Sequence, residues 1–491
     1  MSQLDRELGG EEPGAPGDVG RRHEAGAAEP VEVGGDNVGA DDPSLAAGAE
    51  RDERARAREL AADAREAPLR EPEQARAAGV VVEADDEARR EPVAEARPVE
   101  RSEQAKGAGA ERRRDGDPDA AGGRRSHDRR RAWAEVLAWG IAARLVVLAA
   151  AVVVPRVRWP DSVVYGRHSG LFGLLGTWDG RWYGIVADRG YLLVPGRQSD
   201  PAFFPLLPVS LHALHALGLS LLAAGLVLSN LAFLVGLVAF YELGRVLVPE
   251  PEARRAACYA AIFPAGFVFS MVYPEALAFT VLALAGLLAY RRRWLAAAVC
   301  AAAASFARPE GVLVALPLLV LALRLWPRMR TLERGSALGA VLAAPAALAA
   351  YPLYLWWSLG DPYAWQKAER AWGRSFRADG WLRAIHILSL HPSHGVYPLA
   401  GAILAGVYLA ALVFAWRLDV PLAWLVFGAG LVLLPPFSGT FAADSRFGLL
   451  ALPVYWGLAR LGRSRAVDVS LRLLAVPLLA AGVASIPYWF P

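Results

Sequence analysis

The residues best suited to chemistry lie in one short stretch, residues 177–191, which holds two tryptophans, two tyrosines, two aspartates and two arginines. Trp178, Trp182 and Ile185 recur at helical spacing, so the stretch is predicted to form an amphipathic helix at the membrane interface. Asp179 stands at the start of that helix. A carboxylate in this position is suited to act as a general base, or it simply caps the helix. Spacing alone leaves both readings open.

Four further segments place charged or turn-forming residues at breaks between apolar runs. An ionised side chain near the middle of a bilayer costs about 2.5–3.5 kcal/mol, so such residues are expected at helix ends or in a site. The orientation of the membrane spans that is predicted below puts all four segments on the same outer face as Asp179. A membrane-surface active site requires such an arrangement. Their alternative role is that of helix boundaries. The segments are Tyr273-Pro274-Glu275, Arg308-Pro309-Glu310-Gly311, residues 360–395, and residues 438–446 with Asp444 and Arg446.

Composition divides the chain into two unlike parts, so its net charge of +3 is an average that says little about partners. Residues 1–131 are rich in Ala, Arg, Glu and Gly and are predicted to be a disordered tail. Residues 132–491 are a succession of apolar and aromatic runs, which predicts an all-α polytopic membrane domain. The chain starts without a basic and apolar leader, and arginines precede the first span, so the tail is expected in the cytoplasm.

We expect about eleven transmembrane helices, with the C-terminus outside. Residues 203–217 are the main ambiguity: if they crossed the membrane, the later arginine clusters would lie outside, so we place them in the outer interface. Residues 155–217 then form the first extracytoplasmic loop and residues 358–395 a large one. The expected spans are 133–154, 219–248, 256–272, 274–290, 294–307, 311–326, 336–357, 396–416, 421–436, 447–461 and 468–487.

Several of these motifs together resemble those of the PIG-V-type mannosyltransferases, which are GPI mannosyltransferase 2-like members of the GT-C class of glycosyltransferases. The resemblance covers nearly all of residues 132–465 and none of the tail. The first two motifs in the list that follows are fairly specific when they occur together. The matching motifs are Trp178-Asp179 with Tyr183 and Gly190-Tyr191, Phe203-Phe204-Pro205-Leu206-Leu207-Pro208, Ser229-Asn230, Phe263-Pro264 with Tyr273-Pro274-Glu275, Arg308-Pro309-Glu310-Gly311, Gly360-Asp361-Pro362 with Trp372, and Ser438-Gly439-Thr440 with Arg446.

The resemblance implies a GT-C fold and a transferase that uses a polyprenyl-phosphate-linked sugar, usually mannose, outside the plasma membrane. The acceptor would be a lipid, a glycan or a protein. Asp179 matches the acidic residue that this class places at the reaction centre, which makes it the candidate base. The candidate substrate- and phosphate-binding residues are Arg446, Arg308, Glu275, Trp178 and Tyr183.

The chemistry agrees with these residue types. The base would take the proton of the acceptor hydroxyl, and arginine forks match the oxygens of a leaving phosphate. Single displacement inverts the sugar carbon. Arginines supply the positive charge in this scheme, so no metal or other cofactor is expected, and His386, His391 and His394 lack the spacing of metal ligands.

Two other functions stay open. A transporter or lipid flippase would show an internal repeat and broken helices near mid-membrane. No repeat is visible in the sequence. A degenerate family member that acts only as a scaffold would tolerate the loss of Asp179. No nucleic-acid motif is present, and neither a partner subunit nor the role of the tail follows from the sequence.

Overall fold

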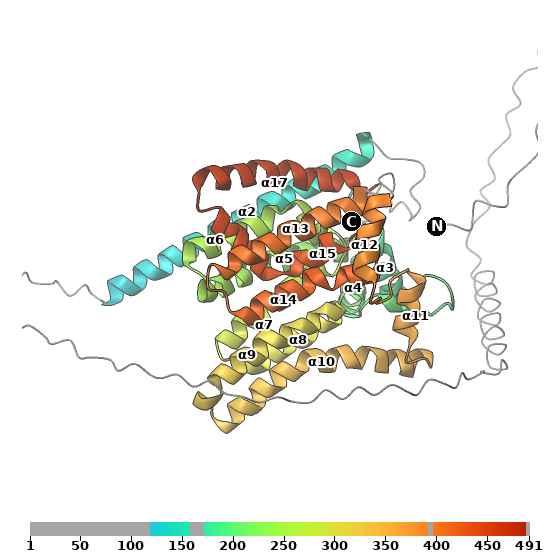
Figure 1. Cartoon of the computed structure of the whole chain (residues 1–491), viewed down its shortest axis with the longest axis horizontal. Helices are drawn as coiled ribbons and strands as arrows, with labels where there is room; N and C mark the ends of the chain where they lie inside the picture. Colours follow the sequence, from blue (N-terminus) through green and yellow to red (C-terminus); the bar gives the residue numbers. More distant parts are fainter. Residues whose placement is uncertain (1–117, 158–170, 391–395, 488–491) are drawn as a thin grey trace, which may run out of the picture. The chain divides into compact units, whose positions relative to one another are not determined.

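The computed structural model describes residues 118–157, 171–390 and 396–487 (Figure 1). Most of the predicted tail, and the histidines at 391 and 394, lie outside these ranges. Within them every regular element is a helix, and no strand occurs. The predicted all-α membrane architecture is therefore confirmed for the described part of the chain.

Six of the described helices are long and apolar enough to cross a membrane, and a bent pair raises the number to seven. They fall in α2 (Pro118–Val157), α5 (Leu221–Leu247), η4 (Pro309–Val314) continued by α9 (Ala315–Leu325) and η5 (Trp326–Arg328), α10 (Thr331–Leu359), α13 (Val396–Trp416) and α17 (Arg465–Ser485). The bent pair is η3 (Pro264–Ser270) and α7 (Glu275–Tyr290).

The remaining predicted spans fall on shorter helices, so the count of eleven stays a prediction. These are α6 (Glu250–Ile262), α8 (Trp294–Ala307), α14 (Leu422–Leu433) with η7 (Pro435–Ser438), and η8 (Gly448–Leu450) with α16 (Leu452–Leu461). Residues 203–217 contain only α4 (Leu206–Ala216), whose 11 residues are too short for a ~30 Å crossing. The interfacial position of this segment stays a prediction.

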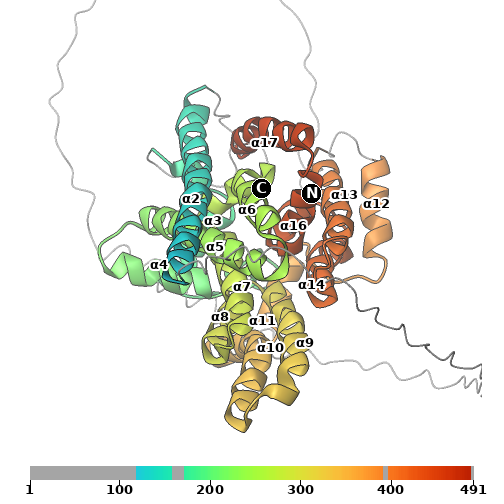
Figure 2. The same cartoon turned by 90° about the vertical axis from the view of Figure 1, so that its left-hand side faces the viewer.

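Small side chains allow the long helices to pack closely, as is usual in membranes. Gly236 of α5 lies against Thr280 of α7, and Gly457 of α16 lies against the backbone of Ala411 in α13. Alanines line the contact between α8 and α10, which run side by side with α9 in both views (Figures 1 and 2). The aromatic core, which includes Phe240 stacked on Trp456, fills the space between α5 and α16.

The bend between η3 and α7 is the feature of the fold that matters most for the site. The two helices meet at 97°, with Pro264 beginning η3 and Pro274 preceding α7. Arg144 of α2 is buried against η3 and donates hydrogen bonds to the carbonyls of Ala261 (3.1 Å) and Gly266 (2.9 Å). The break thus leaves Tyr273 and Glu275 at a helix start inside the protein, both fully buried.

Candidate active site

The first element of the site is α3 (Asp179–Arg189), which confirms the helix expected in residues 177–191. Trp178, just before it, has the backbone angles φ 57° and ψ −125°, which are unusual for a residue other than glycine. Its indole N–H donates to the carbonyl of Ile486 at 2.8 Å, a contact that anchors this conformation. Strained backbone of this kind concentrates at functional sites.

Asp179 follows directly and is only 4% exposed. It is the first residue of α3 and lies one position past the N-cap, which is Trp178. Its backbone N–H donates to the hydroxyl of Tyr273 at 3.3 Å. Its carboxylate accepts a hydrogen bond from Nη1 of Arg446 at 2.7 Å. The carboxylate is thus engaged with a distant arginine, which is more than a simple helix cap requires.

Arg446 reaches Asp179 from the short helix α15 (Asp444–Phe447). Its side chain is 3% exposed, and Nη1 also lies 3.8 Å from Oε1 of Glu275. The guanidinium stands 5.4 Å from the ring centre of Tyr273. One buried arginine therefore joins two carboxylates that come from α3 and from the start of α7.

Arg308 completes a second buried pair. Its Nη1 donates to Oε1 of Glu275, and its Nε donates to Oε2 of Glu310 at 3.2 Å. The guanidinium lies 4.4 Å from the ring centre of Phe447. Oε2 of Glu275 has no hydrogen-bond partner among the described residues. The two arginines and three carboxylates form one connected cluster with a formal charge of −1 in this part of the chain.

Tyr183 belongs to the same neighbourhood, one turn after Asp179 on α3. Burial raises the pKa of its hydroxyl, the carboxylates of Asp179 and Glu275 raise it further, and Arg308 and Arg446 oppose them. Tyr183 also packs edge-on against Phe203. The structure thus brings together five of the six residues singled out from the sequence. The sixth, Trp178, directly precedes Asp179 in the chain.

An aromatic cluster joins α3 to the segments around residues 203 and 372. Trp182 stacks on Phe203, and Trp372 meets both rings edge-on, with centroids 5.3 and 5.6 Å away. The indole N–H of Trp372 donates to the carbonyl of Ser199 at 3.1 Å. Trp372 directly follows α11 (Ala364–Ala371), so the large loop is tied to the first one.

Two acidic residues near the cluster were not singled out from the sequence. Glu310 was visible in the Arg308 motif, but only its contact with Arg308 reveals a role. Glu369 lies on α11, and no spacing signal marked it. Burial raises the pKa of Glu369 to about 7; Arg374 opposes this, while Glu310 and Asp179 add to it. The pKa of Glu369 is therefore sensitive to the charges of the site.

Asp444, named from the sequence in the same segment as Arg446, lies two positions before that arginine. It is fully buried, and neither carboxylate oxygen has a hydrogen-bond partner in the described structure. Burial raises its pKa to about 8. A protonated, neutral carboxyl satisfies this apolar position better than a carboxylate does.

A cavity of about 330 Å³ lies along another face of α3. Its lining combines small glycines, apolar side chains and charged groups of α3. Its lining residues are Gly176, Gly180, Arg181, Gly184, Ile185, Asp188, Arg189, Leu221, Leu222 and Val272. Such a lining suits a ligand with both an apolar and a charged part.

Among the residues that the structure describes, no three His, Cys, Asp or Glu side chains lie close enough together to hold a metal ion. His386 lies on α12 (Gly380–Leu390), while the other two histidines of its group are outside the described ranges. The metal-free scheme stays a prediction.

No family model matches the chain, and no curated protein matches it in sequence. Among solved structures, it is similar to the archaeal oligosaccharyltransferase AglB from Archaeoglobus fulgidus in complex with an inhibitory peptide and a dolichol-phosphate. The sequence identity is 13%, the TM-score is 0.38, and the match covers 72% of this chain and 56% of that one. The apo form of the Archaeoglobus fulgidus enzyme matches with 15% identity and a TM-score of 0.37 over 70% and 56% of the two chains. The chain thus spans little more than half the length of these proteins.

Proposed function

We propose that this chain is an integral membrane glycosyltransferase of the GT-C class. It transfers mannose from a polyprenyl-phosphate-linked donor to a lipid, glycan or protein acceptor. The single observation that carries the proposal is the buried pair of Asp179 and Arg446, joined through Glu275 to Arg308. A base and two phosphate-binding cations within one cluster are what this displacement needs.

In the proposed step, the acceptor oxygen forms a bond to the anomeric carbon as the bond from that carbon to the phosphate oxygen breaks. The acceptor proton passes to Asp179, and polyprenyl phosphate leaves. The configuration at the sugar carbon inverts. Arg446 and Arg308 take up the charge that grows on the departing phosphate, because the guanidinium fork fits phosphate oxygens.

The ion pairs suggest how binding of the polyprenyl-phosphate-linked sugar would prepare Asp179 to act as the base. A guanidinium has five N–H donors, so Arg446 has donors for both a phosphate and Asp179. A phosphate that draws Arg446 toward itself loosens the hold on Asp179 and frees the carboxylate for the acceptor hydroxyl. Glu275 stays between the two arginines, while Trp178 and Tyr183 line the position of Asp179.

The active site would face the outside of the plasma membrane, with the tail in the cytoplasm. The arginine-rich ends of the helices lie at the opposite ends of α7 and α8 from Glu275 and Arg308. The positive-inside tendency assigns those ends to the cytoplasm.

The experiment compares the purified wild type with Asp179→Asn in lipid, with labelled polyprenyl-phosphate-mannose as donor and a membrane-lipid extract as acceptor. We expect transfer by the wild type and a loss of roughly 10²–10⁴-fold in the variant, the usual contribution of a general base. Asp379→Asn is the control, because Asp379 is an exposed carboxylate that pairs with Arg377 and lies outside both the charged cluster and the cavity along α3. Transfer that survives Asp179→Asn would remove the base assignment and make Glu275 the candidate.

A transporter or lipid flippase remains the second candidate, because the bent pair η3–α7 is a broken helix of the kind that such proteins use. The same reconstituted protein separates the two. If no polyprenyl-linked sugar is transferred and labelled lipid or solute crosses the bilayer, the transporter replaces the transferase.

A further inference from the structure

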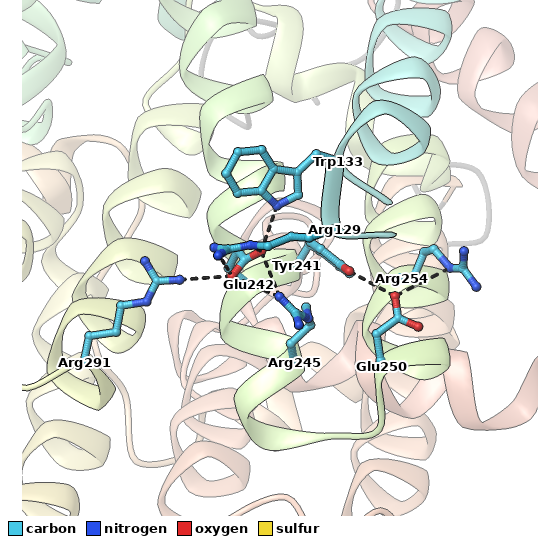
Figure 3. Close-up of polar contacts among 8 residues, drawn as sticks. All are labelled: Arg129, Trp133, Tyr241, Glu242, Arg245, Glu250, Arg254 and Arg291. Atoms are coloured by element: carbon cyan, nitrogen blue, oxygen red, sulfur yellow. Dashed lines mark hydrogen bonds and ion pairs between the residues drawn. The ribbon is translucent and has the colours of Figure 1, made fainter. Parts of the chain in front are cut away.

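A second charged cluster lies around Glu242, close to the C-terminal end of α5 (Figure 3). α7 begins at Glu275 of the candidate site and ends at Tyr290, next to Arg291 of this cluster. The 16 residues of α7 separate the two positions by about 24 Å. The Glu242 cluster is therefore independent of the proposed active site.

Three arginines from three helical regions converge on this one carboxylate. Arg129 of α2 holds both oxygens of Glu242, at 2.9 and 2.8 Å. Arg291, at the C-cap of α7, donates to Oε2 at 3.0 Å. Arg245 of α5 contacts Oε1 at 3.3 Å. The indole N–H of Trp133 adds a further bond to Oε1 at 2.7 Å.

The carboxylate of Glu242 cannot accept hydrogen bonds from all the N–H groups of these three arginines. Two carboxylate oxygens offer about four acceptor positions, whereas three guanidiniums present about fifteen N–H groups. Glu242 is only 7% exposed, but the side chains of Arg129, Arg245 and Arg291 are 40%, 35% and 43% exposed. Their outer N–H groups therefore point away from Glu242, toward the surroundings.

The cluster also has a surplus of two positive charges among the residues described here. The nearby Arg254 does not add to it, because Arg254 pairs with Glu135 at 3.1 Å and with Glu250 at 4.0 Å. Tyr241 donates to the same Glu250 at 3.0 Å. Figure 3 shows Arg254 and Glu250 beside the Glu242 cluster. With Glu135, this second group carries a formal charge of −1, so the two groups together keep one surplus positive charge among the described residues.

An ion-pair clamp between α2, α5 and α7 would need only one arginine for one glutamate. The extra cations, half-exposed where apolar spans end, fit an anion that stays at the membrane surface. Ile141 and Leu145 of α2 are 47% and 60% exposed and offer an apolar surface on the same helix for acyl chains. A tryptophan at this level is typical of the headgroup zone.

We propose that Arg129, Arg245 and Arg291 bind the phosphate of an anionic phospholipid, with Glu242 as the buried carboxylate that holds the three guanidiniums in place. Basic pockets between membrane helices are known to bind anionic headgroups. Free phosphate has the same chemistry, so the experiment must distinguish the two sources.

The test measures the thermal stability of the purified full-length protein in detergent, with added phosphatidylglycerol, phosphatidylcholine or inorganic phosphate. The wild type is expected to gain stability with phosphatidylglycerol alone. Arg245→Gln combined with Arg291→Gln should weaken the apparent lipid affinity roughly tenfold or more, since each arginine near an anionic surface contributes measurably. Arg293→Gln removes an exposed charge from the same loop and should leave the affinity close to that of the wild type.

Glu242→Gln separates lipid binding from a purely structural clamp. It keeps the side-chain shape and one acceptor oxygen for the guanidiniums and raises the positive charge of the cluster, so we expect the stabilisation by phosphatidylglycerol to persist. If the cluster is only a clamp, Glu242→Gln and the double arginine variant lower stability alike, in every lipid. That result would overturn the proposal. Equal stabilisation by inorganic phosphate, or equal loss in Arg293→Gln, would also overturn it.

Discussion

Asp179 and Arg446 are 267 positions apart in the sequence, yet they form a 2.7 Å ion pair in which both side chains are buried. Removing one partner of such a pair leaves an uncompensated buried charge, which is costly. The informative changes at this site are therefore those that keep size or charge and alter one chemical property.

Arg446→Lys is such a change. It keeps the positive charge and loses the planar fork, so we expect transfer to fall by roughly tenfold or more while the fold persists. The measurement is the rate of mannose transfer against donor concentration, with a melting curve of the same sample. A lysine variant with wild-type kinetics would show that only the charge matters, and Arg446 would lose its proposed role in phosphate binding.

Asp444→Asn tests whether the buried carboxyl of Asp444 is neutral in the folded protein. Burial raises the pKa of Asp444 to about 8, far above that of an unfolded aspartate. Between about pH 4 and pH 8 the folded state therefore holds a proton that the unfolded state has lost, so this group makes stability fall as pH rises, by at most about 1.4 kcal/mol per unit. Asparagine does not titrate. Between pH 5 and pH 8 the melting temperature of the wild type should therefore fall more than that of the variant. Parallel curves of melting temperature against pH would contradict this.

At the scale of helices and turns, the position of Arg308 depends on Gly311. A Cβ at Gly311 would overlap the carbonyl of Ala304 and lie 2.7 Å from the backbone nitrogen of Ser305. Because these are backbone atoms of α8, η4 itself would have to move. We expect Gly311→Ala to lower both the melting temperature and the rate of transfer.

Gly339→Ala is the control for that change. Gly339 lies inside α10 with no atom near an added Cβ, and alanine in a helix is favoured over glycine by about 0.5–1 kcal/mol. It should stabilise slightly and leave transfer unchanged. If Gly311→Ala kept stability and transfer as Gly339→Ala is expected to, the turn around Gly311 would tolerate a side chain and the prediction would be wrong.

The helices themselves were largely predictable, because apolar runs that are interrupted by proline, glycine and arginine mark where helices begin and end. The predicted helix in residues 177–191 matches an observed element, and residues 203–217 contain one short helix. The pairing of Asp179 with Arg446 was not predictable, since it depends on tertiary packing between distant segments. The same holds for Glu369, which only the fold of α11 brings near Asp179.

At the scale of the whole molecule, orientation in the membrane is the testable property. Arg197 lies in the loop between α3 and η2, whereas Arg293 lies between α7 and α8 among arginines predicted to be cytoplasmic. In a background where Cys258 and Cys300 are changed to serine, we expect Arg197→Cys to react with a membrane-impermeant maleimide in intact cells. Arg293→Cys should react only after permeabilisation. The reverse pattern would invert the proposed topology.

The distance in sequence between Asp179 and Arg446 also has a consequence for biogenesis. The ribosome delivers Asp179 to the membrane long before Arg446, which comes only after α13 and α14. During that interval the carboxylate lacks the partner that compensates its burial, so the local fold around it gains its full stability late. A shortened product that ends before residue 446 lacks the pair and, with it, the assembled site. Arg446, the later of the two arginines of the cluster to be synthesised, thus completes the ion-pair cluster.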